Sequence, residues 1–274
     1  MSKVSIDLDE MTAKRIGVVN TKYARKQVQD FIKKHISEKH TVIAEYNKNH
    51  DEKGRFSSAD RAVRISYKDG TKISVADVRK QAQILIAKAS SKNDAFQKTV
   101  SDLAKKLNTK ALAGPVKKID RVVEKVIEDY HGDVSKIKDI VRATIEIRDP
   151  NDISKYVKQA KKDLSVIGEK NTMREKGYRD YKLTIGLGND VKAEIIIATP
   201  AVLYAKASKK EGGLGGHDLY NIVRAKSTPS ALSKEVNQKM TDLYTWSNNE
   251  TIANAKKGNP LFLDDYIKEG IQPK

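Results

Sequence analysis

The chain contains no cysteine, few aromatic residues and no long apolar run. Without cysteine it can form neither disulfides nor thiolate metal sites, which suits a reducing compartment or a protein that crosses compartments. Aromatic side chains make up 6% of the 274 residues, and they form no obvious base-stacking platform. No apolar stretch approaches the roughly 18–20 residues of a membrane span. The opening MSKVSIDLDEM lacks an apolar core, so we expect no secretory signal.

Positive charge is the strongest global feature of the composition. The formal net charge is +17, with 53 Lys and Arg against 36 Asp and Glu. Such a surface attracts polyanions such as phosphates, nucleotides or RNA. The alternative is a lysine-rich surface that only keeps the protein in solution. Hydrophobic residues, at 38%, suffice for a core, and the length allows one large domain or two modest ones.

The first third of the chain has its own pattern. Apolar spacing predicts an amphipathic helix within residues 22–38, then a short strand, TVIAEY. Lys68-Asp69-Gly70 is typical of a hairpin turn. A helix over 76–89 follows, and Ser90–Asp94 is interpreted as a linker that caps the next helix. We therefore expect an accessory or delivery module at residues 1–90 and a second domain at residues 91–274.

Helical and strand patterns are mixed in the second part of the chain. The predicted β-hairpin is centred on Gly188-Asn189-Asp190. The pattern favours an α+β fold. The expected helices cover 94–108, 115–130, 151–163, a segment after Thr199 and roughly 229–245, and the expected strands cover 141–147, 181–187 and 191–199.

A row of cations marks the predicted helix that begins at Pro115, a residue suited to a first helical turn. Lys117, Arg121 and Lys125 recur every four residues and so would line one exposed stripe, along which a polyphosphate could lie. The alternative is a solvated face on which Glu124 and a further glutamate pair with these cations.

Two carboxylates occupy strand positions. Asp139 lies where the 141–147 strand begins, a position open to a cleft, although it also fits an ordinary strand start. Glu194 interrupts an apolar strand, VKAEIIIAT. An unpaired buried carboxylate is costly, so Glu194 either faces solvent or binds a cation.

Two loops carry further candidates. In REKGYRDYK, Tyr178 follows a glycine among cations that include Lys176 and Arg179, so its ring could stack on a base. The run GGLGGHDLY lacks the ending of a Walker motif and reads as a loop that leads into a helix begun near His217.

Taken in order, five segments resemble the synthetase domain of the RelA/SpoT family, over roughly residues 94–226. That family has a basic helix, an Asp-Ile/Leu-x-x-x-Arg strand, a GYR loop, an E-I-Q-x-x-T strand and a histidine-containing helix. The matching stretches are KKIDRVVEK, KDIVRATIEI, EKGYRDYKLTI, KAEIIIAT and GGHDLYNIVR.

The resemblance implies a nucleotidyltransferase-like mixed β-sheet flanked by helices, with a small amino-terminal helical and hairpin module. ATP would donate pyrophosphate to a nucleotide 3′-hydroxyl. In this family's terms Lys117, Arg121 and Lys125 look like the ATP-phosphate stripe, and Asp139 and Glu194 like the Mg²⁺ pair. Glu194 is also a candidate for activating the 3′-hydroxyl. The remaining carried-over residues are Tyr178 as acceptor-base stacker, Lys176 and Arg179 as phosphate ligands, and His217 as a weaker member of the site.

Departures from the family pattern point to the small toxin branch. Ile196 replaces the usual Gln, and Asp180-Tyr181-Lys182 replaces the usual Ser-x-His. These changes put guanosine specificity in doubt and favour an adenosine acceptor, either a free nucleotide or the tRNA 3′ end. No constellation of metal ligands for a hydrolase domain is present in the sequence. Synthesis of alarmones without a hydrolase to degrade them would be toxic in the bacterial cytoplasm. The resemblance therefore implies an immunity or antitoxin partner.

The loop NKNHDEKGRFSS resembles the linker of MuF-type phage head proteins and their toxin fusions. This similarity implies a phage-delivered or secreted effector. Three function classes therefore remain open: a pyrophosphokinase of free nucleotides, the same chemistry on tRNA, and a non-catalytic phage structural or nucleic-acid-binding protein.

Overall fold

A computed structural model describes residues 64–67, 69–173, 177–207, 215–224, 230–256, 258, 261–269 and 271. The helix predicted within 22–38, the strand TVIAEY and the MuF-like loop lie outside these residues. The described strands are β1 (Arg64–Ser66), β2 (Lys72–Ser74), β3 (Ala111–Ala113), β4 (Val141–Glu146), β5 (Val166–Asn171), β6 (Tyr181–Gly186) and β7 (Lys192–Ala198). The α-helices are α4 (Val75–Lys106), α5 (Ile119–Tyr130), α6 (Ile153–Asp163), α7 (Pro200–Ala207), α8 (Gly216–Arg224), α9 (Ser230–Lys256) and α10 (Leu263–Glu269), with short 3₁₀ helices at Val134–Lys136 and Pro150–Asp152.

A mixed five-stranded sheet organises the fold. Its strand order is β3-β4-β7-β6-β5, in which β4 and β7 are parallel and the other neighbours are antiparallel. The predicted hairpin is confirmed, because β6 and β7 pair through a turn in which Gly188, Asn189 and Asp190 all have positive φ. The predicted α+β class is therefore confirmed.

The two faces of the sheet differ in character. Side chains alternate along each strand, and on one face the apolar set packs with α4, α5 and α6 into the main core. Examples are Ala143 on β4, Ile195 on β7 and Leu183 on β6. The other face carries Arg142, Glu194 and several further polar residues. The candidate chemistry therefore lies on the face away from α4 and α6.

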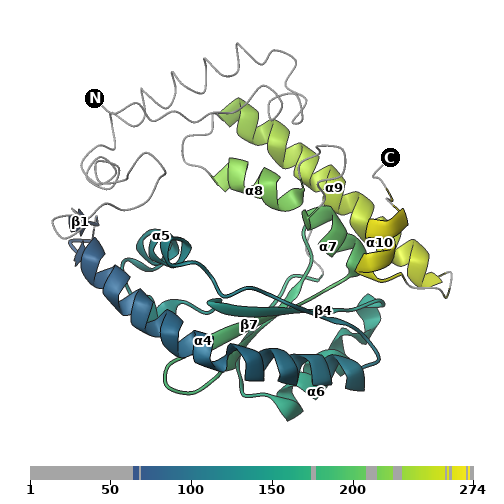
Figure 1. Ribbon diagram of the computed structural model, residues 1–274. Coiled ribbons are helices and arrows are strands. Elements are labelled where there is room, and N and C mark those ends of the chain that lie inside the picture. The colour runs from purple at the N-terminus through teal and green to yellow at the C-terminus, as the bar shows by residue number, and fades with distance from the viewer. Residues whose placement is uncertain are drawn as a thin grey trace.

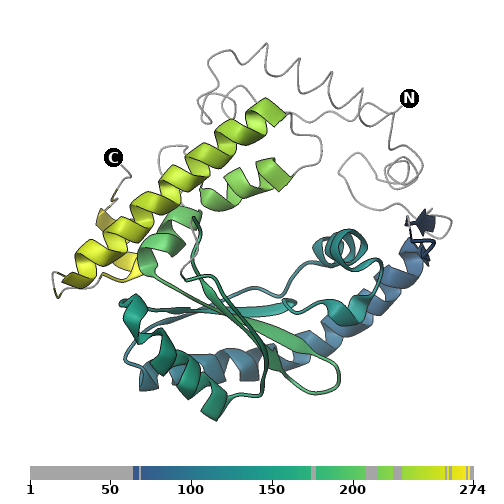
Figure 2. The ribbon, with the colours of Figure 1, turned by 180° about the vertical axis from the view of Figure 1, so that it is seen from behind.

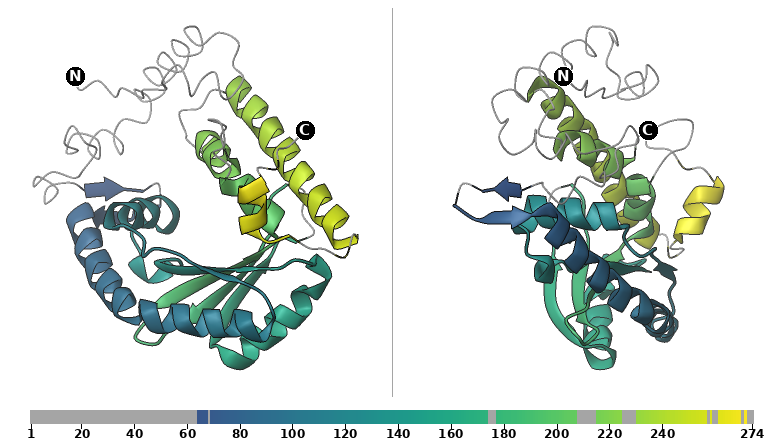
Figure 3. Two further views of the ribbon diagram at one scale, coloured as in Figure 1. Left: turned by 45° about the vertical axis from the view of Figure 1, so that its right-hand side comes forward. Right: turned by 60° about the vertical axis from the view of Figure 1, so that its left-hand side comes forward.

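The carboxyl-terminal helices cover one end of this polar face. In Figures 1 and 2, α4 and α6 lie on one side of the sheet, and α7 to α10 lie on the other. Leu203 of α7 packs on Ile196 and Ala198 of β7, with Leu263 of α10 beside them. Figure 3 shows α9 running along α7 and α8. None of the helices in the described residues is long and apolar enough to cross a bilayer.

The linker predicted at Ser90–Asp94 is wrong. These residues lie inside α4, a continuous helix of 32 residues. Buried Ala89 and Phe96 keep the apolar face of α4 on the core across this polar stretch, and packing of that face outweighs the local preference for a cap. The boundary placed at residue 90 thus falls inside a helix, while the role of residues 1–63 stays a prediction.

The hairpin predicted around Asp69 is confirmed as β1 and β2, and it packs on the main core. Ile65 is buried, and the Tyr67 hydroxyl donates a hydrogen bond to the Ile127 carbonyl at 2.7 Å. The hairpin therefore connects directly to the helix that carries Lys125.

Two predictions at element level need correction. The helix expected from Pro115 begins only at Ile119, because the preceding segment runs alongside β4, where the Lys117 N–H donates to the Ile140 carbonyl at 2.9 Å. Strands β3 and β5 were not predicted. They are the two edges of the sheet, one only three residues long and the other mostly exposed, so neither has a regular apolar alternation.

A buried carboxylate at the end of β4 holds the carboxyl-terminal helix. Glu146 is fully buried; its Oε2 accepts a hydrogen bond from the Leu263 N–H at 2.9 Å, and its Oε1 has no partner among the described atoms. Burial raises the pKa of Glu146. The ionised form of Glu146 is therefore less favourable in the native state than in the unfolded chain.

We expect Glu146→Gln to stabilise the protein by roughly 1 kcal/mol near pH 7.5. The native pKa of Glu146 is raised, so wild type loses stability above the ordinary glutamate pKa and regains it as the pH falls. The advantage of the variant should shrink toward pH 5. Urea unfolding at both pH values measures it, and an advantage independent of pH would contradict this account.

Candidate active site

Asp139 is the centre of an ion-pair cluster at the start of β4. Its Oδ2 lies 2.5 Å from Lys117 Nζ and 3.0 Å from Lys125 Nζ. Its Oδ1 is buried and has no hydrogen-bond partner among the described atoms. One carboxylate oxygen is thus held by two cations, and the other is open to an additional ligand.

The charged groups of this cluster shift one another's pKa values. Burial by itself would raise the pKa of Asp139, but Lys117 and then Lys125 outweigh it, so the pKa lies below its usual value. Burial lowers the pKa of Lys117, and nearby Lys125 lowers it further. Asp139 is therefore held ionised.

Glu194 lies on β7, beside the strand that Asp139 precedes. In the sheet Glu194 is paired in register with Arg142 of β4 and Thr184 of β6. Burial raises the pKa of Glu194, and the charge of Asp139 raises it further, against the opposing charge of Lys182. The charge of one predicted carboxylate thus acts on the other, and the two belong to neighbouring strands of the sheet.

The loop that carries Tyr178 is closed by a clip between its two ends. The Thr172 hydroxyl contacts Asp180 Oδ1 at 3.0 Å, and the Thr172 N–H donates to the Asp180 carbonyl at 2.9 Å. Asp180 is 1% exposed, and Lys182 Nζ lies 3.3 Å from its Oδ2. The unusual Asp180-Tyr181-Lys182 flank therefore contains an ion pair between a buried Asp180 and a partly exposed Lys182.

Tyr178 is half-buried beside the helices α7 and α9. Its ring meets Tyr244 edge-on, with centroids 5.2 Å apart, and Lys206 Nζ lies 5.2 Å from its centroid. Lys206 also donates a hydrogen bond to the Tyr178 hydroxyl at 3.4 Å. Burial raises the pKa of Tyr178, so the phenol stays protonated. The ring is therefore fixed by contacts rather than free in a loop.

Sequence reasoning missed Lys206 and treated Asp180 only as a departure from a family pattern. Lys206 is the one charged residue of α7, whose other members up to Ala205 are buried. A lone lysine in an apolar helix was the available signal. Arg142, within the stretch KDIVRATIEI, is a further site residue, because it is paired in register with Glu194.

The remaining predicted residues differ in placement. Arg121 is exposed and pairs with Glu124, which matches the solvated-face alternative for that position. Lys176 lies outside the described residues, and Arg179 is partly buried. His217 is exposed on α8, where burial and then the charge of Lys206 lower its pKa.

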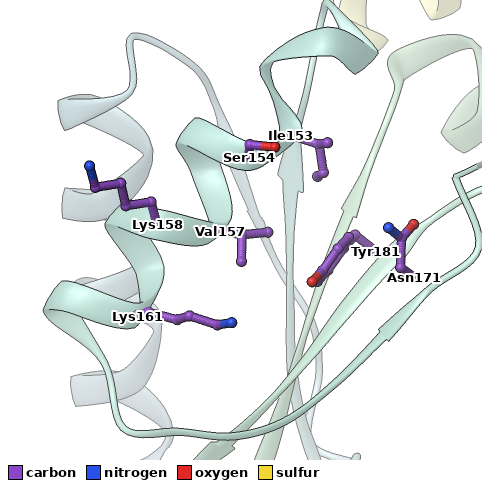
Figure 4. Close-up of a pocket in the computed structure, with 7 residues that line it drawn as sticks. All are labelled: Ile153, Ser154, Val157, Lys158, Lys161, Asn171 and Tyr181. Carbon is purple, nitrogen blue, oxygen red and sulfur yellow. The ribbon is translucent and has the colours of Figure 1, made fainter.

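A separate cavity of about 400 Å³ lies between α6 and the β5–β6 edge. It is lined by Ile153, Ser154, Val157, Lys158, Lys161, Asn171 and Tyr181. In Figure 4, Lys161 and Tyr181 point toward each other, while Lys158 points away. Glu169 binds both Lys161 and the Tyr181 hydroxyl at 2.9 Å. The cavity is on the core side of the sheet, away from Glu194. Its inward-pointing lysine, Lys161, is already paired with Glu169.

The cations of the predicted stripe should differ in their effect on stability. Lys117 is nearly buried against Asp139, with 13% of its side chain exposed, whereas the Arg121 side chain is 60% exposed. We expect Lys117→Met to destabilise by roughly 1–3 kcal/mol, since it removes a cation from a buried carboxylate. Arg121→Ala should cost about 0–1 kcal/mol.

Urea unfolding of both variants tests this difference. Equal stability losses would mean that the buried Lys117–Asp139 contact contributes no more than the exposed pair. The expectation that all three stripe residues are exposed is wrong for Lys117 and Lys125, whose side chains are 13% and 25% exposed.

No protein-family model matches the chain. The solved structure of the Type VI effector Tas1 with its immunity protein superposes with a TM-score of 0.51 at 22% identity, covering 62% of this chain and 97% of that chain. The small alarmone synthetase 1 of Bacillus subtilis, bound to its product pppGpp, gives a TM-score of 0.48 at 16% identity, covering 65% and 98%. The chain thus has the fold seen in the Tas1 structure.

At sequence level, 126 residues are 29% identical to the (p)ppApp synthetase toxin Tas1 of Pseudomonas aeruginosa. This alignment covers 46% of the chain but only 29% of Tas1, so the chain spans less than a third of that relative. The predicted resemblance to the small toxic synthetases of the RelA/SpoT type is confirmed.

Proposed function

We propose that the protein is a transferase that moves pyrophosphate from ATP to the 3′-hydroxyl of an adenosine nucleotide, with a guanosine nucleotide as a second acceptor. The products would be (p)ppApp-like or (p)ppGpp-like alarmones. One observation carries the proposal: Asp139 is held by Lys117 and Lys125 through one carboxylate oxygen, and its other oxygen is buried without a partner among the described atoms. Its charge also acts on Glu194 of the neighbouring strand. The similarity to a (p)ppApp synthetase toxin supports it.

The cations of this cluster would hold the donor. Lys117 and Lys125 both contact Asp139, so a polyphosphate bound beside them would lie next to the two carboxylates. Arg121, exposed on the same helix, would extend the positive surface toward solvent. Such clamps catalyse phosphoryl-type transfer by positioning the donor and by neutralising charge.

The donor set suits Mg²⁺. Asp139 Oδ1 is an unpartnered buried oxygen, and Glu194 supplies further oxygens nearby. The described residues contain no cluster of three or more carboxylate, histidine or cysteine side chains. Two carboxylates still fit, because Mg²⁺ is commonly held by one or two carboxylates together with substrate phosphates. Bound there, Mg²⁺ would offset the negative charge of the phosphates.

The proposed step is an in-line displacement. The acceptor 3′-oxygen attacks the β-phosphorus of ATP, and a new O–P bond forms. The bond from that phosphorus to the oxygen bridging the α-phosphate breaks, and its electron pair leaves with AMP. The hydroxyl proton passes to Glu194, whose burial favours the protonated carboxyl. Lys117 and Lys125 would hold the phosphates in line.

The acceptor base would stack on Tyr178. Its ring is fixed by Tyr244 and Lys206 and is still partly exposed. The ion pair of Asp180 and Lys182, where the family often has Ser-x-His, is the reason for favouring adenine over guanine. Arg179, Lys176 and His217 remain candidates for contacts with the phosphates.

We further propose a toxin role in the bacterial cytoplasm. The Tas1 structure contains an effector bound to its immunity protein. By analogy, this chain would need a neutralising partner in the cell that makes it. The segment before the β1–β2 hairpin, residues 1–63, which includes the MuF-like loop, would serve delivery by a phage or a secretion system.

Transfer to the 3′ end of tRNA is a second candidate, favoured by the net charge of +17. A non-catalytic phage structural protein is a third, and it rests only on the amino-terminal motif. Neither has support in the similarity to Tas1.

Labelled ATP distinguishes these candidates. The protein is incubated with [γ-³²P]ATP, Mg²⁺ and AMP, ADP, GDP or total tRNA, and AMP release is measured beside labelled products. We expect AMP release to match label on adenosine nucleotides, and no label in Asp139→Asn. Label only on tRNA would select the second candidate. No AMP release with any acceptor would overturn the proposal.

A further inference from the structure

Lys206 is a cation of the described site that has no carboxylate within salt-bridge distance among the described residues. It is the charged residue of α7, and its Nζ contacts the Tyr178 hydroxyl. Burial lowers the pKa of Lys206, and the charges that act on it include Asp180, Lys182, Glu194 and Arg142. The ammonium group is thus desolvated among groups of both signs.

The other site lysines each have a carboxylate partner. Lys117 and Lys125 contact Asp139, and Lys182 contacts Asp180. Within the described part of the chain, no carboxylate oxygen lies within salt-bridge distance of Lys206, and its one recorded hydrogen bond is the 3.4 Å contact with the Tyr178 hydroxyl. An ammonium group has three N–H donors. A desolvated cation with donors to spare is a ready site for an anion.

We propose that Lys206 binds a phosphate group of the acceptor nucleotide. This inference rests on the proposed function and adds to it the requirement that the acceptor carry a phosphate close to the Tyr178 ring. Lys206 Nζ lies 5.2 Å from the centroid of that ring, so a base on Tyr178 brings the rest of its nucleotide within reach. The acceptor is then a nucleoside phosphate, and a bare nucleoside is bound weakly.

The donor phosphates are a poorer match for Lys206. The cations beside the open carboxylate oxygen are Lys117 and Lys125, which hold Asp139 at the start of β4. Lys206 instead contacts the acceptor loop through Tyr178. Lys117 and Lys125 would therefore bind the donor phosphates, and Lys206 would bind the acceptor phosphate.

Binding measurements test this role without turnover. The donor site of the full chain is saturated with an α,β-methylene analogue of ATP, and calorimetry gives the Kd of adenosine, AMP and ADP. The phosphate advantage is the Kd of adenosine divided by that of ADP. We expect Lys206→Met to reduce this advantage about ten- to a hundredfold, the range for a hydrogen bond to a charged group. Lys206→Arg should retain most of it.

Lys256→Met is the matched control, since Lys256 is exposed at the end of α9 and its loss changes the net charge equally. The control should leave the advantage unchanged. An unchanged advantage in Lys206→Met, no advantage in wild type, or equal weakening of adenosine and ADP would each overturn the proposal. The last result would mean that Lys206 only supports Tyr178. Because binding needs no chemistry, the result stands apart from whether pyrophosphate is transferred.

Discussion

Glu194→Gln is expected to reduce pyrophosphate transfer by about a hundred- to ten-thousandfold, the range for removal of a general acid or base. The amide keeps the shape of the side chain but removes its charge and its capacity to accept the 3′-hydroxyl proton. Asp139→Asn should cause a loss of similar size, because the open oxygen next to Lys117 is the proposed Mg²⁺ ligand.

Variants at the two carboxylates should differ in their free energy of unfolding. Asp139 is held ionised by Lys117 and Lys125, so neutralising it leaves two partly buried lysines without a partner. We expect Asp139→Asn to lower the free energy of unfolding by roughly 1–3 kcal/mol. Burial disfavours the ionised form of Glu194, so Glu194→Gln should leave stability equal or slightly higher. A large loss of activity without a loss of stability is therefore the signature of Glu194.

The measurement is the initial rate of AMP release with saturating ATP and ADP, alongside urea unfolding. Glu269→Gln is the matched control, because Glu269 is exposed on α10 and the substitution changes charge by the same amount. Near-normal turnover in Glu194→Gln would remove Glu194 from the proposed site.

Apolar periodicity predicted the central elements of the fold correctly. Strands β4, β6 and β7 bury one face in the main core, so their alternation is visible in the sequence. The edge strands β3 and β5 lack that burial and left no such pattern. The polar run Ser90–Asp94 looked like a linker because its helical state depends on packing by Ala89 and Phe96, which local sequence cannot express.

Members of the candidate site were predictable from the sequence where a single residue differs in chemical character from its neighbours along the chain. Glu194 in an apolar strand and Asp139 at a strand start are both recognisable alone. Lys117 was placed on an exposed stripe because its contact with Asp139 joins positions 22 residues apart. The contact of Lys206 with Tyr178 joins positions 28 residues apart, and no spacing rule along the chain predicts it.

Tyr178→Ala should reduce use of the acceptor about ten- to a hundredfold, since stacking contributes about 1–3 kcal/mol per base. ATP binding should change little, because the donor cations surround Asp139 on the other side of Glu194's strand. The readout is kcat/KM for ADP as acceptor, with the KM of ATP measured separately.

Tyr178→Phe distinguishes the contribution of ring stacking from that of the hydroxyl contact with Lys206. Phenylalanine keeps the ring and its edge contact with Tyr244, so it should recover most of the loss. It also removes the acceptor of the Lys206 hydrogen bond, which at 3.4 Å is long. We expect the remaining deficit to be about two- to tenfold, the scale of one ordinary hydrogen bond. Tyr181→Phe is the matched control, because it loses a hydroxyl contact with Glu169 on the core side of the sheet.

The preference for one acceptor base over another tests the proposed role of the Tyr178 loop most directly. Stacking on Tyr178 tolerates any base, so discrimination must come from groups at the edge of the acceptor pocket. The ion pair between buried Asp180 and partly exposed Lys182 lies in the flank of the loop, where the family often has Ser-x-His. We therefore expect adenosine nucleotides to be better acceptors than guanosine nucleotides, by kcat/KM, in both wild type and Tyr178→Phe. A strict requirement for GDP or GTP, with no labelling of adenosine nucleotides, would contradict the adenine preference and leave Tyr178 as a stacking residue for guanine.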